Sequence, residues 1–299
     1  MDLVQVMAMT EDEARVFLEK VRWPDGPVCV CGSAEITRIK GKSARPGLMQ
    51  CRSCHKQFTV TVGTVMEDSR IGLRKWVAAF HLMCGSKKGV SSLQLKRNLG
   101  IAYQTAWHLS HRIRAAMKVE RPKRKLKGRA EIVEVDETYV GGRSRLGIPG
   151  RGSERKTPVM ALVERGGRIR TRVIEHVNQA TLKSAIRELV DRRAEIHSDE
   201  WSGYAGLAKE WAAGHKIVNH KAKEYVRGNV FTNTAESFFA LLKRGVHGTF
   251  HWVSKKHLQR YCDEFGFRWD HRKVSDGTRT LQALMQSKGK RLTYNPLRN

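Results

Sequence analysis

No stretch of the 299-residue chain is apolar over the roughly 18 residues that a membrane-spanning helix needs. The first residues, MDLVQVMAMTEDEARVF, also lack the basic segment that precedes the apolar part of a secretory signal. No internal repeat and no long low-complexity segment is present. These absences argue against membrane, exported and repeat proteins, and they predict a cytoplasmic protein whose thiols stay reduced.

Acidic residues are scarce, because 29 Asp and Glu stand against 56 Lys and Arg, for a formal net charge of +27. A charge of that size repels itself in the folded state, so an anionic partner is expected. Nucleic acid fits best, since each phosphate that the protein neutralises releases a counterion and adds affinity. The alternative is a basic enzyme without such a partner. The length allows about two domains.

The six cysteines are then metal ligands or core residues rather than disulfides. Cys29 and Cys31 form one close pair, and Cys51 and Cys54 form a second pair about twenty residues later. Four thiolates in two such knuckles can hold one tetrahedral Zn²⁺, which stabilises a module too small for its own core. The first pair is one residue short of the usual spacing, so a metal-free hairpin with buried cysteines is the alternative. His55 could substitute as a ligand.

Residues 70–118 have the apolar spacing of helices throughout. The pattern predicts a helix from Leu73, a short helix capped by Ser91 and ending at Gly100, and a longer third helix. This order of helices is typical of a helix-turn-helix motif. Many three-helix bundles share this pattern without binding DNA, but the strong positive charge favours a DNA-binding role. The third helix is predicted to meet base edges or phosphates through exposed Gln104, Thr105, His108 and Arg112.

Two aspartates end strand-like runs in the second half of the chain, where strands and helices alternate as in α/β domains. EIVEVDETYVGG reads as a buried strand with Asp136 near its end, and AEIHSDEWSGY places Asp199 at the end of a later strand. Three strands, a helix and a fourth strand are the order of an RNase H-like domain, in which the first and fourth strands are neighbours. Glu236, on the helix from Asn233, would complete an acidic cluster.

Three carboxylates that close repel one another unless cations neutralise them. Mg²⁺ accepts such oxygen ligands and leaves positions open for phosphate, and two ions can clamp a phosphoryl displacement. Lys243 lies two helical turns after Glu236 on the same face, so it would direct a positive charge at the same phosphate region. Asn233 and Arg244 are further candidates for DNA contact. Either aspartate alone could instead be a turn former or a helix cap.

The fold class predicted from these patterns is α/β, with a mixed sheet and flanking helices. The predicted segments are an N-terminal helix with a zinc-ribbon-like module (1–66), a helix-turn-helix DNA-binding domain (67–119), a basic linker (120–130), an RNase H-like catalytic domain (131–272) and a basic C-terminal tail (273–299).

The whole chain resembles the IS1595-type insertion-sequence transposases with an ISXO2-like catalytic domain. WPDGPVCVCGS and CRSCHKQFTVTVGTVMEDSR resemble the family's zinc-ribbon start, although members commonly have CPxC where this chain has Cys29-Val-Cys31. VDETYVGG, HSDEWSGY and TNTAESFFALLKRGVHGTFHWVS resemble its three catalytic motifs. The resemblance implies an RNase H-like recombinase with Asp136, Asp199 and Glu236 as the triad and Lys243 as the accompanying basic residue.

The expected activity is therefore transposition of an insertion sequence by two Mg²⁺ ions, for which Mn²⁺ can substitute. The enzyme would cleave transposon ends and join the freed 3′-OH to target DNA. The expected partners are double-stranded DNA, as terminal inverted repeats and target, and a second copy of the chain in a synaptic complex at the bacterial nucleoid. Two alternatives are a sequence-specific DNA-binding regulator with an inactive RNase H-like domain, and an RNase H-like nuclease without strand transfer.

Overall fold

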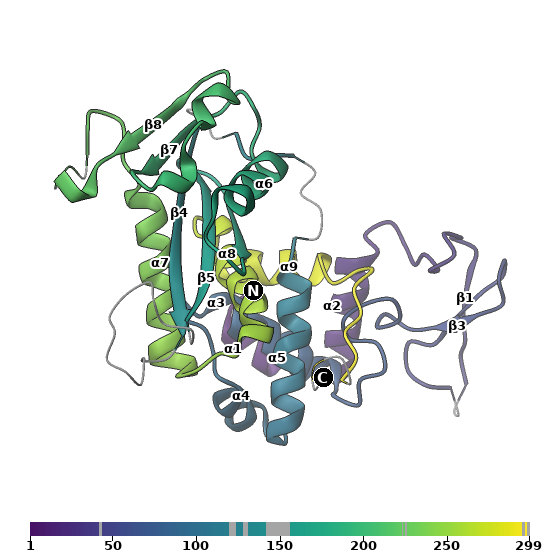
Figure 1. Ribbon diagram of the computed structural model, residues 1–299. Coiled ribbons are helices and arrows are strands. Elements are labelled where there is room, and N and C mark those ends of the chain that lie inside the picture. Colours follow the sequence, from purple (N-terminus) through teal and green to yellow (C-terminus); the bar gives the residue numbers. More distant parts are fainter. Residues whose placement is uncertain are drawn as a thin grey trace. The chain divides into compact units, whose positions relative to one another are not determined.

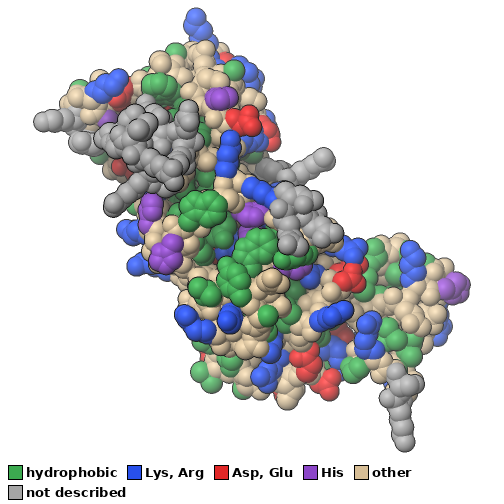
Figure 2. Space-filling model, turned by 60° about the horizontal axis from the view of Figure 1, so that its bottom comes forward, with side chains coloured by type: hydrophobic (Ala, Val, Ile, Leu, Met, Phe, Trp, Pro, Cys, Tyr) green, Lys and Arg blue, Asp and Glu red, His purple; other side chains and the backbone are tan. Residues whose placement is uncertain are grey.

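The computed structural model describes residues 1–41, 44–119, 124–127, 131–141, 156–222, 224, 226–294 and 297. Two units emerge: Met1–Lys118 with Lys273–Asn299 form unit 1, and Val119–Arg272 form unit 2. Among the described residues, no helix combines the length and the apolar character that crossing a membrane requires. Lys and Arg side chains are spread over the face drawn in Figure 2, as the composition leads one to expect.

Unit 1 is mainly helical (Figure 1), and side-chain caps begin several of its helices. The N–H of Glu13 donates to the Thr10 hydroxyl at 3.2 Å and the N–H of Thr10 donates to the Glu13 carboxylate at 2.7 Å, which forms a capping box at the start of α2. Ser91 caps the short helix, and Gly100 ends it in the left-handed conformation (φ 58°). The helices are α1 (Leu3–Ala8), α2 (Glu11–Arg22), α3 (Leu73–Gly85), α4 (Ser92–Leu99), α5 (Tyr103–Met117) and α9 (Asp276–Met285).

Unit 1 also contains a cysteine-bearing β module, which is tied to α2 by a hydrogen bond from the Arg38 guanidinium to the Glu19 carboxylate at 2.7 Å. Its antiparallel sheet has the order β1 (Ile36–Arg38), β2 (Met49–Cys51), β3 (Gln57–Phe58). The Glu11 carboxylate at the start of α2 accepts hydrogen bonds from the N–H groups of Leu73 and Arg74, in the first turn of α3. Gly72 permits this approach, because a Cβ there would lie 2.9 Å from the Glu11 carboxylate.

The prediction of a basic tail over residues 273–299 is wrong where α9 forms, because this helix packs against α2 and α3. Ser275 caps α9, and Thr280, Ala283 and Leu284 are buried on it. Thr280 is polar, and its hydroxyl lies 3.2 Å from Nδ1 of His81 in α3. A buried face this short and partly polar leaves no clear apolar period in the sequence.

Unit 2 is built on a mixed five-stranded sheet with the order β6-β5-β4-β7-β8. β4 pairs antiparallel with β5 and parallel with β7, and β7 pairs parallel with β8. This order and these directions confirm the RNase H-like prediction, including the neighbouring first and fourth strands. The elements are β4 (Ile132–Gly141), β5 (Lys156–Glu164), β6 (Ile169–Val173), α6 (Gln179–Leu189), β7 (Glu195–Asp199), β8 (His215–Val218), α7 (Asn233–Gly245) and α8 (Lys255–Asp270).

Helices cover both faces of the sheet, with α6 on one side and α7 and α8 on the other (Figure 1). Leu182 and Ile186 of α6 pack against Val133 and Val135 of β4 in one core cluster. The second cluster joins α7 and α8 to β5, with side chains such as Phe238 and Phe265 fully buried. β5, covered on both faces, carries the continuous apolar run Pro158–Val163, whereas the apolar residues of β4 are interrupted by Glu134, Asp136 and Glu137.

Part of the predicted basic linker belongs to unit 2. Residues 120–123 and 128–130 lie outside the described residues, but 124–127 are described. Leu126 is buried and forms a parallel bridge with Val190 just after α6. The N–H of Lys127 donates to the Glu164 carboxylate at 2.7 Å. These four residues are therefore packed on the sheet domain.

We expect Leu284→Ala to lower the free energy of unfolding of unit 1 by about 2–4 kcal/mol, because a side chain only 4% exposed would leave a cavity against its neighbours. Met285→Ala is the control, since Met285 is 61% exposed and its truncation should change stability by less than about 0.5 kcal/mol. Urea unfolding of the full chain measures both. Equal, small effects would show that α9 is not part of the core of unit 1.

Candidate functional site

The register of the central strands brings Asp136 and Asp199 to the same level of the sheet. β4 and β7 are parallel neighbours in which Glu134 pairs with His197. Asp136 and Asp199 each lie two residues further along, so their side chains leave the sheet on corresponding positions. Asp136 is also opposite Ala161 of β5. The predicted neighbourhood of the two aspartates is thus a direct consequence of strand order.

Negative charge accumulates around Asp136. Burial raises the pKa of the Asp136 carboxyl to about 8, because the charged form is poorly solvated there. The carboxylates of Glu137, Asp199 and Glu236 add to this rise by repulsion. A hydrogen bond from the N–H of Glu137 to Asp136 Oδ1, 2.7 Å long, opposes it without cancelling it. Asp136 therefore lies among acidic side chains, an environment that would favour a nearby cation.

Glu236 lies in the first turn of α7 and is the most accessible of the three acids, with 49% of its side chain exposed. Its Oε1 lies 3.8 Å from Nε2 of His220. The N–H of His220 in turn donates to Glu200 at 2.9 Å. Among the described residues the three carboxylates influence one another, but their oxygens do not converge as the ligands of the cysteine cluster do.

Glu134 was not predicted as a site residue, yet it ties β4 to the start of α7. Its carboxylate has no exposed surface and accepts hydrogen bonds from the N–H and the hydroxyl of Thr234, both at 2.8 Å. The N–H of Ala235 donates to the same carboxylate at 3.2 Å. Glu134 thus caps the helix that carries Glu236. The sequence signal was its position two residues before Asp136, on the same face of an otherwise apolar strand.

Tyr204 also contacts the acidic cluster, because its hydroxyl donates to the Glu137 carboxylate. Burial, helped by the neighbouring carboxylates, raises the pKa of Tyr204 well above its usual value, so it remains a donor. Trp201 follows the cluster in sequence, and its N–H donates to Asp199 Oδ1 at 3.1 Å. Tyr204 is fully buried and is therefore a packing residue rather than a platform for a base.

Lys243 and Arg244 are in the last turn of α7, while Asn233 begins it. Asn233 and Arg244 are exposed, and Lys243 is half-buried. Asn233 therefore lies at the same end of the helix as Glu236, and the two cations lie about 10 Å further along its axis. All three positions are open to a bound chain of phosphates.

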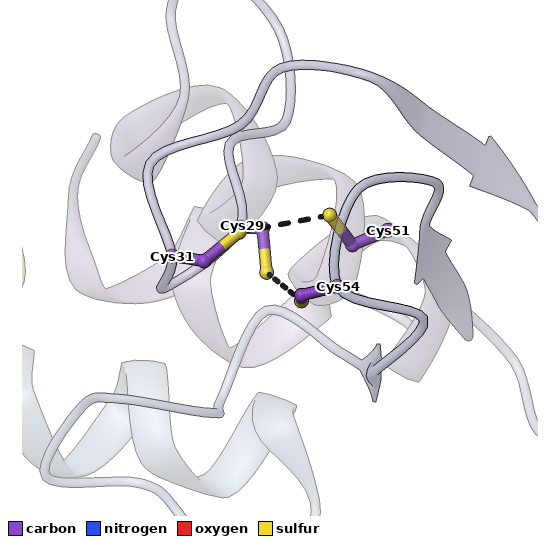
Figure 3. Close-up of side chains that lie close together, drawn as sticks. All are labelled: Cys29, Cys31, Cys51 and Cys54. Carbon is purple, nitrogen blue, oxygen red and sulfur yellow. Dashed lines mark hydrogen bonds between the residues drawn. The ribbon is translucent and has the colours of Figure 1, made fainter.

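The four cysteine side chains of the β module point toward one another (Figure 3). Cys29 Sγ lies 3.6 Å from Cys54 Sγ, Cys31 Sγ lies 3.7 Å from Cys51 Sγ, and all four sulfurs lie within 4.8 Å of one another. Four thiolates about 2.3 Å from a tetrahedral Zn²⁺ are about 3.8 Å apart, so this donor set fits zinc in both distance and chemistry.

The short first knuckle presents both of its sulfurs despite the missing residue. Cys29 and Gly32 close a turn with a hydrogen bond from the Gly32 N–H to the Cys29 carbonyl at 2.9 Å, and Gly32 takes a φ of 96°. In the second knuckle, the N–H of Cys54 donates to Cys51 and lowers the pKa of that thiol to about 6. A metal binds the thiolate, so a thiol that ionises readily is suited to be a ligand. His55 is exposed and outside the cluster.

The predicted DNA-contacting residues of α5 line one groove of about 280 Å³ in unit 1. Gln104 is exposed, Thr105 is half-buried, and His108 Nε2 lies 3.3 Å from the carbonyl of Leu292. An adjacent groove shares Thr105 and Arg70 and adds Arg74 and Lys75, cations that the sequence analysis did not single out. They come from the start of α3 and the segment before it, so only folding brings them beside α5.

The prediction that Arg112 lies on the exposed side of α5 is wrong. Its side chain is only 5% exposed, donates to the carbonyl of Glu67, and stacks 5.2 Å from the centre of the Trp76 ring. Arg112 follows His108 by one helical turn, but α3 covers that part of α5. Within unit 1, Arg112 forms part of the base of the groove.

Comparisons with known proteins agree on one family. The ISXO2-like transposase domain matches residues 125–270, and the transposase zinc-ribbon domain matches residues 9–57. A protein in transposable element ISH50 of Halobacterium salinarum is 32% identical over 280 residues, which cover 87% of this chain and 91% of that protein. The zinc-ribbon match and the four converging thiols together support a structural Zn²⁺.

Two solved structures also match. One is a Mos1 transposase paired-end complex with left transposon end, at 14% identity and a TM-score of 0.29, over 71% of this chain and 74% of that one. The other is a pre-cleavage Mos1 transpososome, at 15% identity and a TM-score of 0.27, over 68% and 75%. At these TM-scores, the RNase H-like assignment rests on the strand order of the chain itself.

We expect the purified protein to carry one zinc ion and Cys51→Ser to lose it, because a hydroxyl is a poor substitute for a thiolate ligand. The loss should also lower the melting temperature of unit 1, since ligand binding and folding of such a module are coupled. His55→Asn is the control and should keep its zinc. Elemental analysis measures the metal, and equal zinc in Cys51→Ser and the unmodified protein would contradict the four-cysteine site.

Proposed function

The chain belongs to the ISXO2-like transposase family of insertion sequences, and from this we propose that it cleaves the ends of its own element and joins them to target DNA through an acidic triad. The main support is that Asp136 and Asp199 lie at corresponding positions on adjacent parallel strands. Glu236 lies on the helix that Glu134 caps. The neighbouring charges that raise the pKa of Asp136 belong to Glu137, Asp199 and Glu236, all of them acidic.

Asp136, Asp199 and Glu236 are the proposed ligands of two Mg²⁺ ions. Carboxylate oxygens are the ligands this ion prefers, and the crowding of negative charge around Asp136 makes cation binding favourable. When bound, the ions supply Lewis-acid activation at both the attacking and the leaving oxygen of an in-line phosphoryl displacement. Mn²⁺, with similar ligand preferences, is expected to substitute.

In the proposed reaction, the protein breaks one phosphodiester bond and forms another in two steps. In the first step a water oxygen bonds to phosphorus at the element end, and the bond from phosphorus to the 3′ oxygen breaks, which leaves a 3′-OH. In the second step that oxygen bonds to a target phosphorus while the target's own ester bond breaks. Asn233, Lys243 and Arg244 bind phosphates along α7 and orient the strand. No energy-rich cofactor is needed, since the first step is a hydrolysis and the second replaces one ester bond with another.

Recognition of the element ends is proposed for the helix-turn-helix of unit 1, within the segment 67–119. α5 offers Gln104, Thr105 and His108 from one groove, and Gln side chains read adenine while Thr contacts either bases or phosphates. Arg70, Arg74 and Lys75 in the adjacent groove would bind phosphates and set the register on the duplex. Because two ends must be held for joining, the active complex is proposed to contain at least two copies.

We expect Asp136→Asn and Glu236→Gln to reduce both cleavage and joining by on the order of 10³-fold, because loss of bound metal removes several kcal/mol of transition-state stabilisation. Glu188→Gln is the control, since Glu188 is on α6 and 60% exposed. The assay uses a labelled duplex with the element's own end, a plasmid target and Mg²⁺ or Mn²⁺.

Joined product from the unmodified chain and from the control only is the expected result. End binding without cleavage or joining in either metal would instead identify a DNA-binding regulator. Cleavage without any joined product would identify a nuclease.

We expect Gln104→Ala and Arg70→Ala to weaken end binding in different ways. Loss of Gln104 should cost about 1–3 kcal/mol on the element end and relax the preference at one base position, whereas loss of Arg70 should weaken all sequences alike and reduce the salt slope by about 1. Arg193→Ala is the control, because Arg193 is already paired with Asp191 at 3.0 Å. DNA titrations at several salt concentrations measure both effects. Unchanged binding by both variants would refute the assignment of the two grooves beside α5 as the DNA-binding surface.

A further inference from the structure

One arginine contacts both strands that carry the aspartates of the triad and the segment that leads into the helix of Glu236. Arg165 follows β5 directly, in the turn toward β6, and 18% of its side chain is exposed. Its Nε donates to Glu134 Oε1 at 3.0 Å, so the first contact is with β4. One of its terminal nitrogens lies 3.3 Å from Nδ1 of His197, so the second contact is with β7.

The third contact of Arg165 is with the segment that leads into α7. The guanidinium donates to the carbonyls of Asn229 at 2.7 Å and Phe231 at 3.1 Å. It also lies 3.6 Å from the centre of the Phe231 ring. A planar guanidinium with five donors can make such a set of contacts at once, whereas an ammonium cannot match its geometry.

Each of these partners is close in sequence to one member of the triad. Glu134 precedes Asp136 by two residues on the same face of β4, and His197 precedes Asp199 by two residues on β7. Glu134 also caps α7 through Thr234 and Ala235, directly before Glu236. Arg165 and Glu134 therefore connect the three backbones whose side chains must converge for metal binding.

A purely stabilising role explains these contacts less well. A buried ion pair often adds no more stability than apolar residues of the same size, and it is retained where it fixes a specific arrangement. Arg170 and Asp270 form another ion pair in the same unit, at 2.9 Å and with only 12% and 11% of the side chains exposed. That pair joins β6 to α8 and touches none of the elements of the triad.

We propose that Arg165, anchored by Glu134, is a positioning residue that sets the distances between Asp136, Asp199 and Glu236 and so determines the affinity for divalent metal. This inference rests on the proposed function for its consequence in metal binding. The connection between the three elements is independent of that function and can be measured in metal-free protein.

The test compares Arg165→Gln, Arg165→Lys and the control Arg170→Gln in the full chain. Amide hydrogen exchange without divalent metal reports on the N–H groups of Thr234 and Ala235. Mn²⁺ binding, followed by paramagnetic resonance, reports on the triad, and thermal melting reports on stability. Asp136→Asn identifies the fraction of Mn²⁺ bound at the triad.

We expect Arg165→Gln to speed exchange at Thr234 and Ala235 and to weaken Mn²⁺ binding by about 10-fold or more, in the range seen when groups that orient metal ligands are removed. Arg165→Lys should recover the melting temperature, because it keeps the charge beside Glu134, but not the Mn²⁺ affinity. Arg170→Gln should lower the melting temperature and leave both other measurements unchanged.

Unchanged exchange at Thr234 and Ala235 in Arg165→Gln overturns the inference, as does Mn²⁺ affinity that falls only in proportion to the melting temperature in all three variants. Absence of Mn²⁺ binding by the unmodified chain would count against the proposed catalytic function instead. In that case hydrogen exchange alone still decides whether Arg165 connects the three elements.

Discussion

Repulsion between carboxylates is the constraint on which the structure of unit 2 depends. Asp136 is half-buried on a central strand beside Asp199, and Glu137 and Glu236 contribute further negative charge. Such a cluster is costly unless the surrounding elements hold it and a cation neutralises it. The apolar layers on both faces of β4 and β5 provide the rigid support, and the contacts of Glu134 with α7 fix the third acid's helix.

The β module of unit 1 solves a related problem with sulfur ligands. Its three strands are two or three residues long, too short to enclose a core of their own. Four converging thiols supply a metal site in place of that core, and an ion pair between Arg38 and Glu19 joins the module to α2. In unit 1, ionisable side chains thus specify a geometry that apolar packing alone would not.

Positive charge is distributed differently from the acidic charge. Lys and Arg outnumber the acids across the whole chain, and many are exposed, so they would act on DNA through the sum of their fields. Some of these cationic side chains are instead packed inside the fold. Arg112 lies under the α5 groove against Trp76, and Arg165 binds Glu134, so the count of basic residues overstates the number available for phosphates.

The sequence by itself determined the order of strands and helices along the chain, the cap at Ser91, the cysteine pairs and the aspartates at strand ends. These features are local, because periodicity and capping depend on residues within a few positions of one another. Only the tertiary structure decided that α9 packs on α3, that Arg112 is buried, and that Arg70, Arg74 and Lys75 adjoin α5. It alone revealed Arg165, whose partners lie more than thirty residues away in the chain. Contacts between distant segments leave no periodic trace in the sequence, since they depend on how separate elements pack.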